Sequence, residues 1–242
     1  KEAYRNGEQP YGRTTMQRDV RWTNFNTLTW KQKVKKHNYD VMLGHEVSYK
    51  STEYLLGEAM GFPFDQMGND NMGLGATPSK VESTFYDKTL LSFYARANYN
   101  YDNRYLFTAT VRADGSTVFS SNKKWGFFPS FSAAWRVSEE AFMKDIKWIS
   151  NFKIRLGWGT VGNDNIPNYL SLDLYEANKY GIGNSSVTVL NPKQLRNKNL
   201  KWEGSNTTNL GIDLGFFDNR LNLTAEFFIK NTKDLLLSQS LA

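Results

Sequence analysis

The chain has 242 residues, with 30 lysines and arginines, 24 aspartates and glutamates, and a formal net charge of +6. It contains no cysteine, which excludes a disulfide framework and a cysteine-ligated metal site. The basic residues are spread along the chain rather than clustered, so we expect no nucleic-acid partner. No run of about 18 apolar residues is present, and the sequence therefore predicts no transmembrane helix.

The first half of the chain contains segments that alternate apolar and polar side chains. Residues 1–18 are polar and rich in turn formers, and we expect a loop there. A strand is expected over 19–33, then a tight turn at 35–38 and a returning strand over 39–49. Residues 51–89 hold several glycines and prolines and are expected to form a long loop.

The clearest alternation lies in a hairpin expected over residues 90–112. One face of its first arm carries Leu91, Phe93, Ala95, Ala97, Tyr99 and Tyr101, and the other carries Ser92, Tyr94, Arg96, Asn98 and Asn100. A period of two residues indicates a strand with two different faces. We expect the turn at Asp102 and Asn103, because these residue types tolerate positive φ.

The second half continues the pattern. In chain order we expect a loop over 113–124, a strand over 125–137, a connector over 138–150, a strand over 151–159, a long loop over 160–206, and a hairpin with arms 207–217 and 220–229 that turns at Asp218 and Asn219. Ser138 is expected to cap one helical turn of the connector, with Glu139 and Glu140 in its first turn.

These elements predict an all-β fold, an antiparallel transmembrane β-barrel segment of about eight long strands with short periplasmic turns and long extracellular loops. Trp125 and Trp135 share one face of a strand and would lie roughly 25 Å apart along the membrane normal, about the distance between two aromatic girdles. Two alternatives remain open. One is a structural or adhesive outer-membrane barrel without transport, and the other is a soluble sugar-binding β-sandwich.

The region from Phe93 to Leu237 carries a series of short motifs in a fixed order. They are Ala95-Arg96-Ala97-Asn98-Tyr99-Asn100-Tyr101, Tyr105-Leu106-Phe107-Thr108-Ala109-Thr110-Val111-Arg112, Asp114-Gly115-Ser116, Trp125-Gly126-Phe127-Phe128-Pro129-Ser130, Ala134-Trp135, Glu140-Ala141-Phe142, Arg155-Leu156-Gly157-Trp158-Gly159, Gly162-Asn163, Trp202-Glu203, Thr207-Thr208-Asn209-Leu210-Gly211-Ile212-Asp213, Asn219-Arg220-Leu221 and Lys233-Asp234-Leu235-Leu236. In order and spacing this region resembles the SusC/RagA family of TonB-linked (TonB-dependent) outer-membrane transporters of Bacteroidota.

The resemblance implies a barrel of about 22 strands with a plug in its lumen. It implies a location in the bacterial outer membrane and contact with membrane lipid. The implied function is the import of large nutrients, either glycans or peptides, and the implied partners are a SusD-like surface lipoprotein that closes as a lid and an inner-membrane TonB complex. No plug domain, TonB-contacting segment or C-terminal strands are recognisable. We therefore expect residues 1–242 to be an internal part of one barrel domain that works with the remainder of the barrel and its plug.

The sequence offers no catalytic constellation, so we expect no enzyme. His37 and His45 lack further ligands at metal-binding spacing, and we expect no metal and no cofactor. The expected long loops contain aromatic side chains that could stack on sugar rings or pack against a lid protein. The candidate ligand-binding residues are Tyr54, Phe62, Phe64, Tyr169, Tyr175 and Tyr180.

Overall fold

The computed structural model of the chain describes residues 4–5, 9–63, 70–183, 185–197 and 199–237. The strands are β1 (Tyr4–Arg5), β2 (Gln9–Val34), β3 (His37–Met60), β4 (Thr77–Tyr101), β5 (Tyr105–Ser116), β6 (Trp125–Arg136), β7 (Ile149–Asn163), β8 (Leu174–Ile182), β9 (Ser185–Gln194), β10 (Glu203–Phe216) and β11 (Leu221–Lys233). The described residues also form the short 3-10 turns η2 (Met72–Leu74), η3 (Val137–Glu139) and η4 (Ala141–Met143). The expected all-β antiparallel fold is confirmed.

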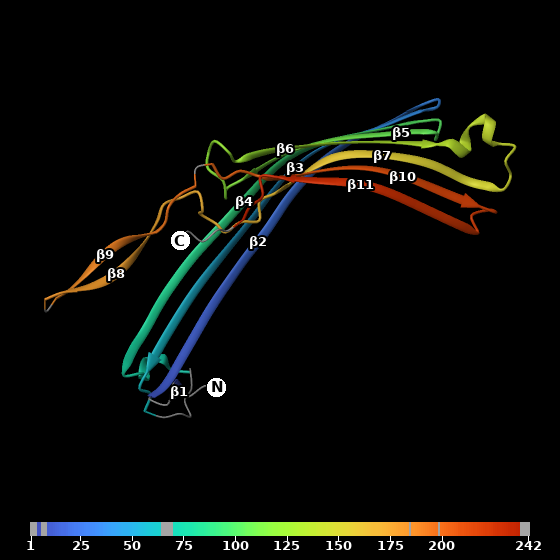
Figure 1. The fold of residues 1–242 in the computed structure, drawn as a ribbon. Coiled ribbons are helices and arrows are strands. Elements are labelled where there is room, and N and C mark those ends of the chain that lie inside the picture. The colour runs from blue at the N-terminus through green and yellow to red at the C-terminus, as the bar shows by residue number, and fades with distance from the viewer. Residues whose placement is uncertain (1–3, 6–8, 64–69, 184, 198, 238–242) are drawn as a thin grey trace. The chain divides into compact units, whose positions relative to one another are not determined.

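Within these described residues, nine strands form one sheet in the order β1-β2-β3-β4-β5-β6-β7-β10-β11, and β8 pairs with β9 in a separate two-stranded ribbon (Figure 1). The order follows the chain except where the ribbon is inserted between β7 and β10. The contacts divide the chain into two units. Unit 1 holds Lys1–Thr23 and Ser48–Thr89, and unit 2 holds Asn24–Val47 and Leu90–Ala242.

Two expected hairpin turns in unit 2 are confirmed. Asp102 and Asn103 have φ of 51° and 56°, between β4 and β5. Asp218 and Asn219 have φ of 57° and 61°, between β10 and β11, and Phe217 before them also has positive φ. Asp and Asn adopt this left-handed conformation more readily than other non-glycine residues, so the local sequence fixes where each hairpin reverses.

The register of the strands in unit 2 separates two faces. Tyr99 lies opposite Phe107, Phe107 opposite Ala133, Ala133 opposite Leu156, and Leu156 opposite Leu210. We call this side the apolar face. It includes Phe93, Ala95, Ala97, Tyr99, Tyr105, Phe107, Ala109, Val111, Phe127, Phe131, Trp135, Ile154, Leu156, Trp158, Leu210, Ile212, Leu214, Leu223, Phe227 and Ile229.

The opposite side, which we call the polar face, is different in chemistry. It includes Ser92, Arg96, Asn98, Arg112, Ser130, Ser132, Lys153, Arg155, Asp213, Glu226 and Lys230. Large side chains on the apolar face are not covered by protein, since Phe131 is 45% exposed and Phe107 and Leu156 are exposed as well. A sandwich would bury such a face against a second sheet. Trp125 and Trp135 both lie on the apolar face, at opposite ends of β6.

Buried apolar side chains are few among the described residues. In unit 1 they are Leu56, Ala59 and Phe62, and in unit 2 they are Val118, Phe119 and Val137. Val118 and Phe119 belong to the loop between β5 and β6. The principal packed cluster of unit 2 therefore lies where this loop meets the strand ends, rather than between layers of the sheet.

Several expected loops are wrong, because strands occupy them. β2 begins at Gln9, within the loop expected over 1–18, and β3 and β4 extend to Met60 and back to Thr77, within the loop expected over 51–89. Gly57 and Pro78 lie inside these strands although both residue types interrupt strands. Pairing with a neighbouring strand overrides local turn propensity here.

The expected loop over 160–206 is also partly wrong, since it contains the β8–β9 ribbon, and β10 begins at Glu203. In the connector, Ser138 is not a cap. The N-cap of η3 is Arg136, which makes no side-chain capping hydrogen bond, and Ser138 lies inside the turn. No helix of the described residues is long and apolar enough to cross a membrane.

Candidate functional site

An arginine network occupies the polar face, near the C-terminal end of β5 and beside the interior of β4. The Nε atom of Arg112 donates to Asp114 Oδ1 at 2.7 Å, and its Nη2 atom donates to Ser92 Oγ at 2.9 Å and to Glu46 Oε2 at 3.2 Å. The guanidinium also lies 5.4 Å from the ring centroid of Tyr94, within cation–π range. This group joins β3, β4 and β5 by charge-assisted hydrogen bonds.

A second arginine network joins β7, β10 and β11. Arg155 donates two hydrogen bonds to Asp213, from Nε at 2.8 Å and from Nη2 at 3.1 Å. Its Nη1 atom lies 3.7 Å from Glu226 Oε1, and Thr224 Oγ1 donates to Asp213 at 3.3 Å. Paired guanidinium and carboxylate groups neutralise each other. These side chains therefore link neighbouring strands instead of presenting an unpaired charge on this part of the polar face. Arg96, by contrast, is exposed and makes no ion pair with any described residue.

Several glycines lie beneath large side chains of the polar face. A Cβ atom on Gly44 would overlap the ring of Tyr94, and one on Gly162 would overlap the ring of Phe128. A Cβ atom on Gly211 would lie 2.9 Å from Nη2 of Arg155. These side chains therefore lie along the sheet, over a neighbouring strand, instead of projecting away from it.

The candidate ligand-binding residues of unit 1 fall in different environments. Tyr54 is half-buried within β3, not in a loop. Phe62 is only 8% exposed, and its Cζ atom would lie 3.3 Å from a Cβ atom on Gly75. Its ring therefore belongs to the small core of this unit and offers little surface for stacking. Phe64 lies outside the described residues.

The candidates of unit 2 lie on or beside the β8–β9 ribbon. Tyr175 is 62% exposed and Tyr180 is 51% exposed, and both belong to β8. They are five positions apart along the strand, so they project from opposite faces of the ribbon. Tyr180 accepts a hydrogen bond from Asn191 at 3.2 Å. Tyr169 precedes the ribbon with φ of 66°, and its carbonyl oxygen accepts a hydrogen bond from Gln194.

The base of the ribbon is held by hydrogen bonds and ion pairs. Gln194 Nε2 donates to the carbonyl oxygens of Tyr169 and Leu172, at 3.0 and 3.1 Å. Arg196 lies 3.3 Å from the carboxylate of Asp173. Both strands of the ribbon carry exposed apolar side chains, including Val187, Val189 and Leu190. The ribbon is thus anchored at its base and presents apolar surface beyond it.

An aromatic cluster lies beside the segment that leads from the ribbon into β10. The ring centroid of Trp202 is 5.2 Å from that of Phe119 and 5.3 Å from that of Phe128. The indole Nε1 atom of Trp202 donates to the carbonyl oxygen of Lys124 at 2.8 Å. Phe119 is 1% exposed. This cluster was not predicted from the sequence, although Trp202-Glu203 is one of the motifs that carry the family resemblance.

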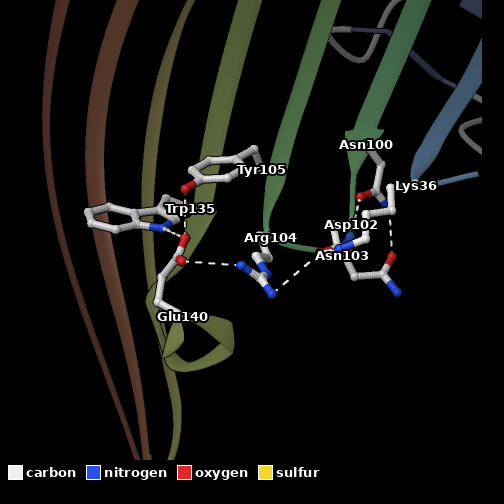
Figure 2. A network of polar contacts seen from close by, with 8 residues as sticks. All are labelled: Lys36, Asn100, Asp102, Asn103, Arg104, Tyr105, Trp135 and Glu140. Carbon is white, nitrogen blue, oxygen red and sulfur yellow. Dashed lines mark hydrogen bonds and ion pairs between the residues drawn. The ribbon is translucent and has the colours of Figure 1, made fainter. Parts of the chain in front are cut away.

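A polar network joins the short turns at the other end of the strands. Figure 2 shows Glu140, from the connector between β6 and β7, pointing toward Tyr105 and Trp135. Its Oε1 atom accepts hydrogen bonds from Tyr105 Oη at 2.7 Å and from Trp135 Nε1 at 3.1 Å. Arg104 bridges Glu140 Oε2 and Asp102 Oδ2, each at 3.4 Å.

The carboxylates of this network are held in their charged form. The hydrogen bond from Tyr105 is the main cause that lowers the pKa of Glu140, and the bond from Trp135 adds to it. The hydrogen bond from Lys36, at 2.8 Å, is the main cause that lowers the pKa of Asp102. Both groups therefore keep their negative charge at neutral pH.

Acidification is expected to loosen the connector over residues 137–148. Because the pKa of Glu140 is lower in the folded state, its contacts add stability above the unfolded-state pKa of about 4.3, and that stability is lost as the pH falls through the folded-state pKa. A spin label at Phe142→Cys in the full-length protein should become more mobile as the pH falls from about 6 to about 3.

The control for this experiment is Glu140→Gln, which removes the titrating group. The label should then be mobile at every pH, with no transition in the acidic range. An unchanged acidic transition in Glu140→Gln would show that another group controls the connector.

The described residues contain no group of three or more His, Cys, Asp or Glu side chains that could hold a metal ion. The side-chain networks are made of paired charges and hydrogen bonds, and the ribbon and the apolar face offer surface for non-covalent contact. This arrangement supports non-covalent binding to the exposed apolar surface and stabilisation of the sheet by side-chain contacts between its strands.

All 242 residues match the family model described as TonB dependent receptor-like, beta-barrel. The chain is 34% identical, over 89% of its length, to TonB-dependent receptor P3 of Formosa agariphila. It is 43% identical, over 62% of its length, to TonB-dependent receptor SusC of Bacteroides thetaiotaomicron. The chain spans 22% and 15% of the lengths of these two relatives.

Among solved structures, the fold is similar to that of the RagAB peptide transporter. The TM-score is 0.87 and the sequence identity is 27%, over 95% of this chain and 25% of the transporter chain. These similarities, together with the uncovered apolar face, contradict the alternative of a soluble β-sandwich.

Proposed function

Because the chain belongs to the TonB-dependent receptor-like β-barrel family, as a relative of SusC and RagA, we propose that it forms part of the wall and the extracellular loops of an importer for large nutrients. Barrels of this family lie in the outer membrane, and their members are transporters rather than enzymes. On this assignment the apolar face meets lipid and the polar face lines the lumen. The observation that carries the proposal is this separation of faces, which the register maintains from β4 to β11.

The proposed substrate class is a glycan or a peptide, and the proposed partner is a SusD-like surface lipoprotein that acts as a lid. The proposed importer also includes the rest of the barrel, its plug and a TonB complex. Support for a peptide comes from the similarity to the RagAB peptide transporter. Support for a surface partner comes from the β8–β9 ribbon, because a two-stranded ribbon with apolar side chains exposed on it gains stability when another surface covers them.

Uptake by the bacterium tests the proposal. A strain that lacks the full-length gene should fail to take up either a labelled peptide pool or a labelled glycan pool, and the wild-type gene should restore uptake. A protonophore should abolish the restored uptake, because import through such a barrel draws on the inner-membrane energy source. Unchanged uptake of both pools in the deletion strain would favour a structural or adhesive barrel.

A contact between the β8–β9 ribbon and the lid lipoprotein predicts different effects on lid binding for substitutions at three exposed side chains of β8. Tyr175→Ala should weaken binding of the purified lid lipoprotein to the full-length barrel about tenfold, because exposed aromatic anchors carry much of the energy of such contacts. Lys179→Ala is the matched control, since Lys179 projects from the same face of β8. Binding is measured in detergent by surface immobilisation of the barrel.

Tyr180→Ala reports on the opposite face of the ribbon. Tyr180 is already hydrogen-bonded within the ribbon, so we expect a change of less than threefold in lid affinity. Equal affinity for wild type and Tyr175→Ala would remove the ribbon from the lid contact, while the uptake experiment would still decide whether the barrel is an importer.

A further inference from the structure

The β8–β9 ribbon has two outer edges that no other strand of the described residues covers. β8 and β9 pair with each other in a separate two-stranded sheet, so each strand offers one side of its backbone to a partner outside the ribbon. A ribbon of two strands is only marginally stable alone, and an unpaired edge is a template for a further strand. An extended polypeptide can therefore add to the ribbon at either edge.

Pro192 determines which backbone groups of the ribbon point outward. It lies opposite Tyr175 and has no N–H, so these two residues cannot form one of the hydrogen-bonded pairs of the ribbon. Hydrogen-bonded and non-hydrogen-bonded pairs alternate along antiparallel strands, so the pairs that Ala177 and Lys179 form with β9 are also non-hydrogen-bonded. The backbone N–H and C=O groups of Ala177 and Lys179 therefore point away from β9, toward the outer edge of β8.

The two edges differ in their protection against strand addition. Pro192 removes one outward N–H from the edge of β9, and proline on an edge strand is a common means of blocking a further strand. β8 contains no proline. The residues of β8 whose backbone groups point outward all carry an N–H and are exposed; they are Tyr175, Ala177, Lys179 and Gly181. The edge of β8 is therefore the one that is open to a partner strand.

The chemistry of this edge suits a peptide better than a saccharide or a second copy of the chain. An extended peptide repeats its N–H and C=O groups with the same period as the edge, whereas the hydroxyl groups of a glycan do not. Lys179 gives the edge a positive charge, which disfavours pairing between the β8 edges of two copies. Ala177 and Gly181 are small, so larger side chains of an added strand fit on either side of Lys179.

We propose that the outer edge of β8 captures an extended peptide as a third strand of the ribbon, with an acidic side chain of the peptide beside Lys179. This inference rests on the importer function proposed above and deepens it, because it makes a peptide the substrate. The similarity of the fold to the RagAB peptide transporter supports it. Main-chain hydrogen bonds give such a strand its affinity, so the edge accepts peptides of different sequences.

The test measures binding of a soluble, fluorescent, threonine-rich peptide with one central glutamate to the full-length barrel in nanodiscs, by fluorescence anisotropy. Ala177→Pro should lower the affinity about tenfold, because it removes an outward N–H and leaves the hydrogen bonds between β8 and β9 intact. A peptide that is N-methylated at two adjacent central residues has lost a donor from each of its edges. Wild type should bind this peptide about tenfold more weakly than the unmethylated one.

Thr188→Pro is the matched control. Thr188 lies opposite Lys179, so its N–H points to the outer edge of β9, and the affinity for the peptide should stay within about twofold of wild type. The N-methylated peptide tests the edge on the unaltered protein, where folding of a variant plays no part.

The proposal is overturned if Ala177→Pro binds the peptide as wild type does, if Thr188→Pro weakens binding as much as Ala177→Pro, or if methylation has no effect. It is also overturned if wild type binds a maltooligosaccharide or a second barrel at this edge instead of the peptide. The uptake experiment is separate from these measurements. A barrel that fails them while its strain still imports either nutrient pool remains an importer, without peptide capture by β8.

Discussion

Replacing Phe119 by alanine is expected to lower the free energy of unfolding of the full-length barrel by about 3–5 kcal/mol. Phe119 is 1% exposed, and its ring packs against Trp202, which in turn contacts Phe128. Removing the ring leaves a cavity beneath the segment that connects the β8–β9 ribbon to β10. Unfolding by denaturant in lipid vesicles measures the loss, and proteolysis within residues 117–124 should become faster.

The matched control is Phe142→Ala. Phe142 is 64% exposed in the connector between β6 and β7, so its removal should change the free energy of unfolding by less than about 1 kcal/mol. Similar losses for the two variants would mean that the Phe119 cluster is not a packed core and that the ribbon is anchored by its polar contacts alone.

The second large effect concerns the face that meets lipid. Phe131→Arg, near the middle of β6, should destabilise the barrel in a bilayer by about 2–4 kcal/mol. Phe131 lies opposite Ala109 and Trp158 on the apolar face and is 45% exposed, so a charged group there would face hydrocarbon. The yield of folded barrel in the outer membrane and the free energy of unfolding in vesicles both measure this cost.

Ser132→Arg is the partner experiment. Ser132 is the next residue, is also exposed, and belongs to the polar face that lines the lumen. A guanidinium there meets water, and we expect a cost below about 1 kcal/mol. Equal costs at the two positions would contradict the assignment of faces.

Hairpins with strong local signals could be predicted from the sequence. The turns at Asp102 and Asn103 and at Asp218 and Asn219 were predictable because the required positive φ is a local property of these residue types. The two faces of β4 and β5 were predictable because each face has a distinct solvent, lipid on one side and water on the other. Membrane strands keep strict alternation for that reason.

The ends of β3 and β4 could not be predicted in the same way. Beyond Tyr49 and before Leu90 the alternation weakens, and glycine and proline suggest turns, but the strands continue to Met60 and begin at Thr77. Their length is set by pairing along the whole of the neighbouring strands, which local patterns do not reveal. The β8–β9 ribbon was also missed, because its apolar residues were interpreted as part of a loop.

The candidate site was predicted less well than the fold. Exposure separated the candidate aromatic residues, because Tyr175 is open to solvent whereas Phe62 is buried against its own unit. Whether a loop aromatic faces solvent or packs inward depends on tertiary contacts, and the residue type alone carries no such information. The network around Glu140 joins residues from two turns and a connector, and it could not be found before the strand order was known.

The glycines beneath Tyr94, Phe128 and Arg155 have a consequence for the free cross-section of the channel. A tyrosine that lies along the wall narrows the passage by the thickness of a ring, whereas one that stands upright narrows it by the length of the whole side chain. These glycines, which carry no side chain, therefore help to set the diameter that is available to a plug or to a substrate. Gly44→Val would narrow the passage, because the new side chain would push the Tyr94 ring away from the wall. The valine itself would contribute less to this narrowing than the displaced ring.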